Sequence, residues 1–398
     1  MRAGVSGFQK ERLVQAREAL GLTQVDLARI IDKASPSISK WENGMNLPEA
    51  DTLQDLAKAL KVPVAFFLNA VPDHGEMPIF FRSMASTTET FRKRTRARLK
   101  WSQDISLSLQ QELDFPKVNV PRLDVSDYRE IRDEDIEEIA GACRKEWGLG
   151  SGPISNVVLA MENAGIIVVK EDVGSVKMDG LSHWSTLDDR PYVLIAKDKD
   201  TCVRSRMDAA HELGHLVLHH SLKEKALNRT DSFKQIEKQA FQFAGSFLMP
   251  GESFGAEIWS PSLDTFVSLK ERWKTSVAAM IVRCRALGII SEAIEKNLWK
   301  YYSSRGWRKC EPLDNNLVSE EPRMLARSIR LLIDEGIKSR EDLINDFRLS
   351  APDIESICGL PRGYMTAQDA EIIAMPELKA TAKKDQHGSG NVIPFKSE

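Results

Sequence analysis

Apolar residues recur every three or four positions through residues 8–68, which is the spacing of one face of an α-helix. Typical helix boundaries divide this segment. Thr23 suits an N-cap, Ser35-Pro36 is a serine N-cap followed by proline at the first helical position, and Gly44 is a C-terminal stop. The pattern predicts a bundle of five short helices. Its expected core is Leu13, Ala16, Leu20, Leu27, Ile31, Ile38, Trp41, Leu53, Leu56 and Leu60.

Two amphipathic helices are expected over residues 130–165, after which the hydrophobic period changes. Continuous apolar runs at 166–169 and 192–196 predict strands. Long helices are expected at about 200–220 and 232–248, and most of the remaining chain is helical. The fold class is therefore multidomain and mainly α: an all-α five-helix domain, an α+β domain with a small sheet, and a C-terminal helical region.

The composition narrows the class of protein. A chain of 398 residues, with 42% hydrophobic and 28% charged residues, suits two or three soluble globular domains. It has no apolar run of about 18 residues, which predicts that no helix spans a membrane. Five scattered cysteines without a CxxC pair argue against a disulfide scaffold and favour a cytoplasmic location. Because 55 basic and 58 acidic residues nearly cancel, partners must be inferred from local charge.

A strongly basic helix is expected after the five-helix segment. Residues 91–101 are rich in lysine and arginine, and the helix continues towards Leu113, with Pro116 ending it. Such a helix can contact phosphates or bind an exposed nucleic-acid strand. A solvated linker helix between two domains is the simpler interpretation of a charge run, and it is the one expected here.

The sequence His211-Glu212-Leu213-Gly214-His215 is the strongest chemical signal in the chain. Residues four apart lie on one face of a helix, so His211 and His215 can bind one zinc ion. Glu212 can reach the open coordination position, accept a proton from metal-bound water and pass it to a leaving amine. This pattern predicts a zinc hydrolase, although manganese can replace zinc in such a site. Histidines that only pack or cap the helix are the alternative.

A catalytic zinc ion needs a third protein ligand. His219 stands about 12 Å along the helix from His211, too far to share an ion. Glu237 opens the next amphipathic helix and can present a carboxylate if the two helices pack antiparallel. We expect Glu237 to complete the site, with Glu224 and Asp231 as fallback candidates in the preceding loop.

A longer two-part motif contains these residues. AHELGHLVLH at 210–219 is followed by ExxAxxFAxxFLMP from Glu237. In this motif the chain resembles the ImmA/IrrE family of zinc metallopeptidases, of the gluzincin type, over roughly residues 130–290. The resemblance implies an α+β peptidase fold that cleaves a helix-turn-helix repressor at one or a few bonds. The family has a small polar residue where Phe241 stands here.

The resemblance also implies a role for each motif residue: zinc ligation by His211, His215 and Glu237, and base catalysis by Glu212. The group that stabilises the oxyanion is not evident from the sequence.

Other residues near the motif have candidate roles. His183, Arg206 and His219 are candidates for the oxyanion-stabilising group. The strand at 192–196 can be an edge strand that pairs with substrate backbone, or a plain core strand. Cys202 can be an inhibitory fourth zinc ligand, although a buried packing cysteine is the expected role.

The N-terminal bundle carries a second motif: LTQxxLA at 22–28, SISKWENG at 37–44, and Leu47-Pro48. In these residues it is similar to the XRE-type helix-turn-helix of phage-repressor-like regulators. Such a fold places its recognition helix in the major groove of DNA. By motif position Gln24 and Asn43 are expected to contact phosphates. Ser35, Ser39 and Lys40 are expected to face the bases, where lysine can donate to guanine.

Five segments are predicted: a helix-turn-helix domain (1–70), a linker with the basic helix (71–125), a peptidase domain (126–295), a C-terminal helical region (296–378) and a flexible tail (379–398). We expect a regulator that binds a double-stranded DNA operator and cleaves a repressor-type protein or itself in stress or phage-related gene control. Paired half-sites in an operator would favour a homodimer. The alternatives are a transcription factor with a non-cleaving metal sensor, an antitoxin-like interaction protein, and a helix-turn-helix kept only for protein contact.

Overall fold

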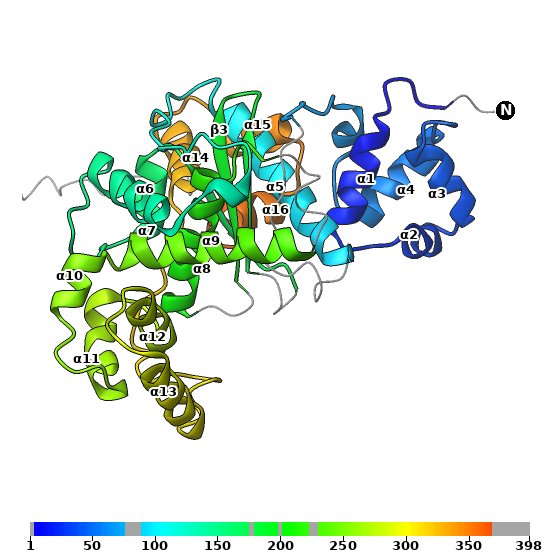
Figure 1. Ribbon diagram of the computed structural model, residues 1–398. Helices are drawn as coiled ribbons and strands as arrows, with labels where there is room; N and C mark the ends of the chain where they lie inside the picture. The colour runs from blue at the N-terminus through cyan, green and yellow to red at the C-terminus, as the bar shows by residue number, and fades with distance from the viewer. Residues whose placement is uncertain (1–3, 76–88, 175–178, 198–200, 223–229, 368–398) are drawn as a thin grey trace, which may run out of the picture. The chain divides into compact units, whose positions relative to one another are not determined.

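Helices account for most of the chain in the computed structural model, which describes residues 4–75, 89–174, 179–197, 201–222 and 230–367 (Figure 1). Residues Met1–Met365 form one unit and Thr366–Glu398 another. The predicted tail lies outside the described residues, as does the fallback ligand Glu224. None of the described helices is both long and apolar enough to cross a membrane.

The N-terminal bundle forms as its sequence predicts. Thr23 caps α2 through a reciprocal capping box with Asp26. Helix α3 begins at Ser35, so Ala34 is its N-cap and the expected serine cap is wrong by one residue. The five helices are α1 (Lys10–Ala19), α2 (Gln24–Ile30), α3 (Ser35–Glu42), α4 (Ala50–Leu60) and the 3-10 helix η1 (Val64–Leu68).

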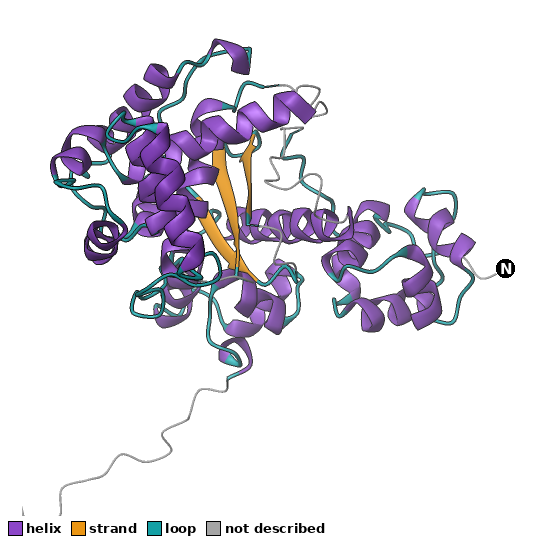
Figure 2. Cartoon of the chain, turned by 60° about the horizontal axis from the view of Figure 1, so that its bottom comes forward, coloured by secondary structure: helices purple, strands orange, loops and turns teal. Residues whose placement is uncertain are grey.

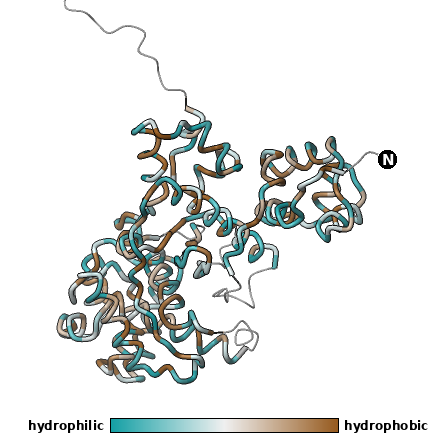
Figure 3. Tube along the Cα trace, turned by 90° about the horizontal axis from the view of Figure 1, so that it is seen from above, coloured by the Kyte–Doolittle hydropathy of each residue, from teal (hydrophilic) through white to brown (hydrophobic). Residues whose placement is uncertain are grey.

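The predicted core of this bundle is confirmed, except that Leu20 is only partly buried and packs against it. Hydrophobic and hydrophilic positions alternate along these helices in Figure 3. One apolar stripe of each helix therefore points inward.

The basic helix α5 (Glu89–Leu109) is a core element, so the expectation of a solvated linker helix is wrong. Trp101 is fully buried, and its ring meets the ring of Phe66 edge to face. Arg98 is also buried, and its guanidinium donates to Glu171 at 2.9 Å and 3.1 Å and to Asp353. Two carboxylates from distant parts of the chain thus neutralise a charge that the local sequence places in solvent.

A three-stranded sheet lies among the helices in the order β1-β3-β2 (Figure 2). Strand β1 (Ile167–Glu171) pairs parallel with β3 (Arg190–Ala196), and β2 (Gly180–Ser185) pairs antiparallel with β3. Because β3 is central, its interpretation as a substrate-pairing edge strand is wrong. The two outer positions belong to β1 and β2, and the sequence pattern does not reveal β2.

The two faces of the sheet join different clusters of side chains. Val168, Trp184 and Val193 pack in the cluster that contains α6–α9 and α11–α13. Leu181 and Leu194, on the opposite face, pack in the cluster that contains α5 and the C-terminal helices. Alternate residues of each strand therefore point either toward the helix of the His-Glu-x-x-His motif or away from it.

The remaining helices follow the order of the chain: η2 (Tyr128–Glu130), α6 (Asp133–Glu146), α7 (Val157–Asn163), α8 (Cys202–Leu218), α9 (Thr230–Leu248), α10 (Gly251–Ala256), α11 (Leu263–Trp273), α12 (Val277–Ala286), α13 (Glu292–Ser304), α14 (Met324–Asp334), α15 (Arg340–Phe347), α16 (Ala351–Cys358) and η4 (Tyr364–Thr366).

Candidate metal centre and nucleic-acid interface

Helices α8 and α9 pack against each other and carry the candidate metal site (Figure 1). Gly214 makes their close approach possible. A Cβ at this position would lie 3.1 Å from the carbonyl oxygen of Ala240 and 3.2 Å from the ring of Phe243. The small residue lets the first half of α9 run beside the histidines of α8, as the antiparallel packing predicted from the sequence requires.

The structure brings His211, His215 and Glu237 together. The two histidine Nε2 atoms lie 3.0 Å apart. The Glu237 carboxylate oxygens lie 3.4 Å from His211 Nε2 and 3.2 Å from His215 Nε2. Ligand atoms about 2.0–2.1 Å from a tetrahedral zinc ion are about 3.3 Å from one another. Two imidazoles and one carboxylate at these separations therefore fit a zinc ion without rearrangement.

The three side chains are buried, and the most exposed of them, Glu237, is 10% exposed. Burial alone would raise the pKa of Glu237, but its contacts with the imidazoles of His211 and His215 hold this pKa well below its ordinary value. The carboxylate is thus kept ionised, the form that binds a metal. Asp231, the described fallback ligand, is exposed and does not join this group.

Glu212 lies against the outer strand β2. A Cβ on Gly180 would stand 2.8 Å from Glu212 Oε1, so a larger residue there would displace the carboxylate. Burial raises the pKa of Glu212 well above its ordinary value; Ser182 opposes this shift, and the charge of Glu237 adds to it. The edge strand therefore positions the candidate base.

The ring of Phe241 lies against the imidazole of His211. Its ring centroid lies 4.2 Å from that of His211, and the two planes are tilted by 47°. The residue lies one turn of α9 after Glu237. An apolar ring thus stands where the ImmA/IrrE resemblance implies a small polar side chain, which excludes a polar contact from this position.

A second layer of polar residues lies behind His215. His215 Nδ1 is 3.0 Å from His219 Nδ1, and His219 Nε2 is 3.2 Å from Gln239 Oε1. Burial lowers the pKa of His219 well below its ordinary value. Gln239 was not predicted from the sequence. The feature that could have indicated it is its place on the predicted helix that carries Glu237 and packs against the histidines.

Neither of the other oxyanion candidates points into the site. His183 is on the opposite face of the sheet, where Gln103 donates to its Nδ1 at 3.0 Å. Arg206 pairs with the buried Glu320, whose carboxylate also accepts from the first N–H groups of α7. His219 supports His215 from behind. The structure therefore assigns these three side chains to support rather than to the site itself.

Cys202 does not reach the metal position. It begins α8 and is buried, nine residues before His211 on the same helix. Nine residues span about 13 Å along a helix axis. The expected packing role fits this placement, and the fourth-ligand alternative does not.

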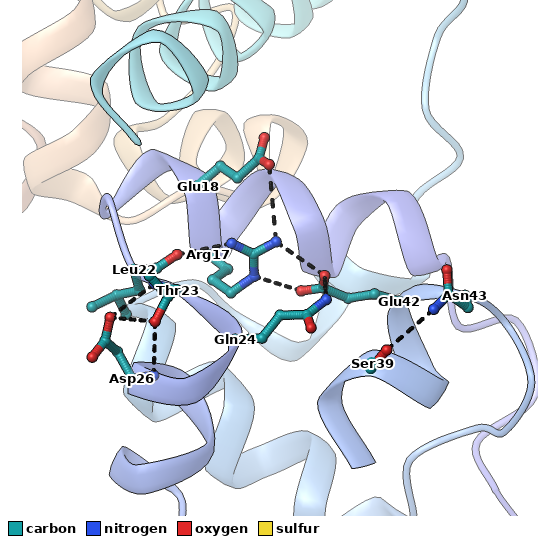
Figure 4. Close-up of polar contacts among 9 residues, drawn as sticks. All are labelled: Arg17, Glu18, Leu22, Thr23, Gln24, Asp26, Ser39, Glu42 and Asn43. Carbon is teal, nitrogen blue, oxygen red and sulfur yellow. Dashed lines mark hydrogen bonds and ion pairs between the residues drawn. The ribbon is translucent and has the colours of Figure 1, made fainter. Parts of the chain in front are cut away.

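Among the candidate DNA-contacting residues, Gln24 lies on α2, Ser39 lies on α3 and Asn43 directly follows α3 (Figure 4). Lys40 is exposed, Ser35 and Ser39 are partly exposed, and the amide of Asn43 donates to Ser39 Oγ at 3.3 Å. Gln24 Nε2 donates to Glu42 at 2.7 Å. Helix α3, which the motif predicts to be the recognition helix, thus presents Lys40 and two serines to solvent.

An ion pair behind this face holds the helices of the motif together. Arg17 donates to Glu42 at 2.6 Å and 3.0 Å, and also to the carbonyl of Leu22 between α1 and α2 (Figure 4). The pair neutralises the Glu42 carboxylate, which would otherwise repel a DNA phosphate. It links α1, the turn before α2, and the end of α3.

Two regions of the chain match the sequence models of known protein families. Residues 161–285 match the sequence model of the peptidase M78 family, an IrrE N-terminal-like domain, and residues 13–67 match a helix-turn-helix family. The predicted fusion and its mainly α fold class, with a small sheet in the peptidase region, are confirmed. These similarities support a DNA-binding regulator that carries a metallopeptidase-family domain.

The chain is also similar to a curated protein from Rhodospirillum rubrum. Its name is "Uncharacterized transcriptional regulator in ATPase CF(0) region", and it is 44% identical over 59 residues. The match covers 15% of this chain and 55% of the relative. The chain thus spans about half the length of that curated relative.

Proposed function

We propose that this protein is a DNA-binding transcriptional regulator with a zinc-dependent endopeptidase domain, and that it cleaves a repressor-type protein or itself. The observation that carries the proposal is the convergence of His211, His215 and Glu237 on one point, with the carboxyl group of Glu212 close enough for the charge of Glu237 to raise its pKa. Two imidazoles and one carboxylate form the ligand set of a hydrolytic zinc site, in which the fourth position stays open.

Each residue has a separate part in the proposed hydrolysis. His211, His215 and Glu237 hold the ion, which supplies Lewis acidity toward the scissile carbonyl when it is bound. Glu212 accepts a proton from the attacking water and returns it to the leaving amine. Gly180 leaves room for the Glu212 carboxylate beside β2.

The N-terminal part supplies the DNA-binding half of the proposal. Lys40, Ser35 and Ser39 on α3 face the bases of an operator, and Gln24 and Asn43 contact its phosphates. The match to a helix-turn-helix family and the exposed basic face of α3 support this role. A homodimer on paired half-sites stays a prediction.

Metal analysis and a cleavage assay test the peptidase proposal. The full chain, loaded with zinc, is incubated with helix-turn-helix repressors encoded beside its gene, and the products are identified by mass spectrometry. Cleavage is expected with the wild type and with Glu271→Gln, a matched change on the exposed face of α11. Glu212→Gln should retain zinc and lose cleavage. A zinc-loaded Glu212→Gln chain that cleaves as fast as the wild type contradicts the proposal.

The burial of the site favours a second candidate function, a metal sensor that cleaves nothing. His211, Glu212 and His215 are each only 1% exposed. A sensor needs the three ligands but not the base. Glu212→Gln should then regulate its operator normally, whereas His215→Ala should not, which separates the two candidates in a reporter assay.

A further inference from the structure

We propose that His219 and Gln239 are positioning residues that fix the tautomer of His215 and so direct the lone pair of its Nε2 to the metal. The inference deepens the proposed zinc site and rests on it only in treating His215 as a ligand. His219 is fully buried and Gln239 is 4% exposed. Solvent therefore has little access to the chain of hydrogen bonds that they form.

The donor and acceptor roles in this series of hydrogen bonds are set by Gln239. Gln239 Nε2 lies 2.7 Å from the carbonyl oxygen of Tyr128 and 3.3 Å from that of Ile131. Carbonyl oxygens only accept hydrogen bonds, so the amide group that faces them must be the NH2 group. A flipped amide would place oxygen against two oxygens. The carboxamide oxygen of Gln239 consequently faces His219.

The same reasoning fixes each imidazole in turn. Gln239 Oε1 only accepts, so His219 Nε2, at 3.2 Å, must carry the hydrogen. His219 Nδ1 then has a lone pair, and it accepts from His215 Nδ1 at 3.0 Å. With its hydrogen on Nδ1, His215 presents the lone pair of Nε2 toward His211 and Glu237. Two backbone carbonyls of the η2 segment thereby orient a ligand through two side chains.

This arrangement predicts a measurable contribution to zinc affinity. Outer partners that hold a ligating histidine contribute about 10–100-fold to metal affinity in proteins. Gln239→Leu removes the acceptor for His219 and should weaken zinc binding by about that factor. Gln242→Leu makes the same chemical change three residues later on α9, at a partly exposed position, and should leave the affinity unchanged.

Tautomers are read directly by nuclear magnetic resonance on the full chain. With its seven histidines labelled with ¹⁵N, long-range ¹H–¹⁵N correlations distinguish the two neutral forms, and His219→Gln assigns the signal. We expect His219 to carry its hydrogen on Nε2 in zinc-loaded and in metal-free protein, because the tautomer is set from the Gln239 side. Finding the hydrogen on Nδ1 of His219, or on both nitrogens, overturns the proposal.

Zinc affinity is measured by competition with a chromophoric chelator. Equal affinities for Gln239→Leu and Gln242→Leu also overturn the proposal. If Gln239→Leu does not fold, the tautomer in the wild type still decides. A wild type that binds no zinc refutes the proposed function instead, because the His219 tautomer remains measurable without metal.

Discussion

Gly180 and Glu212 are in such close contact that a single methyl group on the glycine would meet the carboxylate at 2.8 Å. Gly180→Ala should therefore displace Glu212 and lower the rate of cleavage by about 100-fold or more, the usual contribution of a general base. Zinc affinity should stay within a few-fold of the wild type. The assay is the cleavage reaction that identifies the substrate.

Gly141→Ala is the control for this change. Gly141 lies within α6, and a Cβ there would have no neighbour within 4 Å. This variant should cleave normally and be slightly more stable, since alanine favours a helix. Full activity of Gly180→Ala would show that Glu212 does not need its observed position.

Lys40→Ala should weaken operator binding about tenfold or more, since a lysine contact to a base edge contributes about 1–3 kcal/mol. Binding is measured by fluorescence anisotropy at fixed salt with operator and with unrelated DNA. Lys58→Ala removes the same charge from the exposed side of α4 and should bind normally. Equal binding by the two variants would count against α3 as the recognition helix.

Stability should fall in mild acid because of His183. Burial, followed by the charge of His74, lowers the pKa of His183 from 6.5 to about 4. The unfolded chain thus takes up a proton at a higher pH than the folded chain. The contribution of neutral His183 to the free energy of unfolding is complete above pH 6.5 and is lost as the pH falls from 6.5 toward 4.

The comparison with His183→Gln measures this effect. Between about pH 7.5 and about pH 5, the wild type should lose about 2 kcal/mol more unfolding free energy than the variant. Urea unfolding at the two pH values provides the measurement. An identical loss in both proteins would mean that His183 is readily protonated in the folded state.

Arg206→Met should destabilise the protein by about 3–5 kcal/mol, because it leaves the buried carboxylate of Glu320 without its cation. Glu320→Gln should cost less, since an amide oxygen still accepts from the N–H groups of Val157 and Val158. The double variant should be more stable than the sum of the single losses predicts. Thermal unfolding checks this, and strict additivity would contradict the pairing.

Some features could be predicted because their signals are local. The histidines and Glu212 share one helix, so their geometry follows from helical spacing alone. Glu237 required one further step, the packing of the next amphipathic helix. The helix-turn-helix was predictable for the same reason: its caps and apolar positions all lie within about sixty residues.

Other features depended on contacts between distant parts of the chain. Strand β2 has no alternating pattern because both of its faces are buried, with Ser182 and His183 among its inward-facing polar residues. The charge run around Arg98 indicates a solvated side chain, but Arg98 is buried because Glu171 and Asp353, which are distant in sequence, pair with it. The part played by Gln239 depends on two carbonyl groups more than a hundred positions earlier, which no local pattern encodes.

The contact between the rings of Phe66 and Trp101 determines where an N-terminal fragment of the protein can be cut. An N-terminal fragment that stops near residue 70 would lack Trp101, the aromatic partner of Phe66. It would also lack Asp104 on α5, which accepts a hydrogen bond from the guanidinium of Arg12. Such a fragment would expose apolar surface near its new C-terminus. A fragment made to study the helix-turn-helix domain alone should therefore extend through α5, because a shorter one is expected to aggregate.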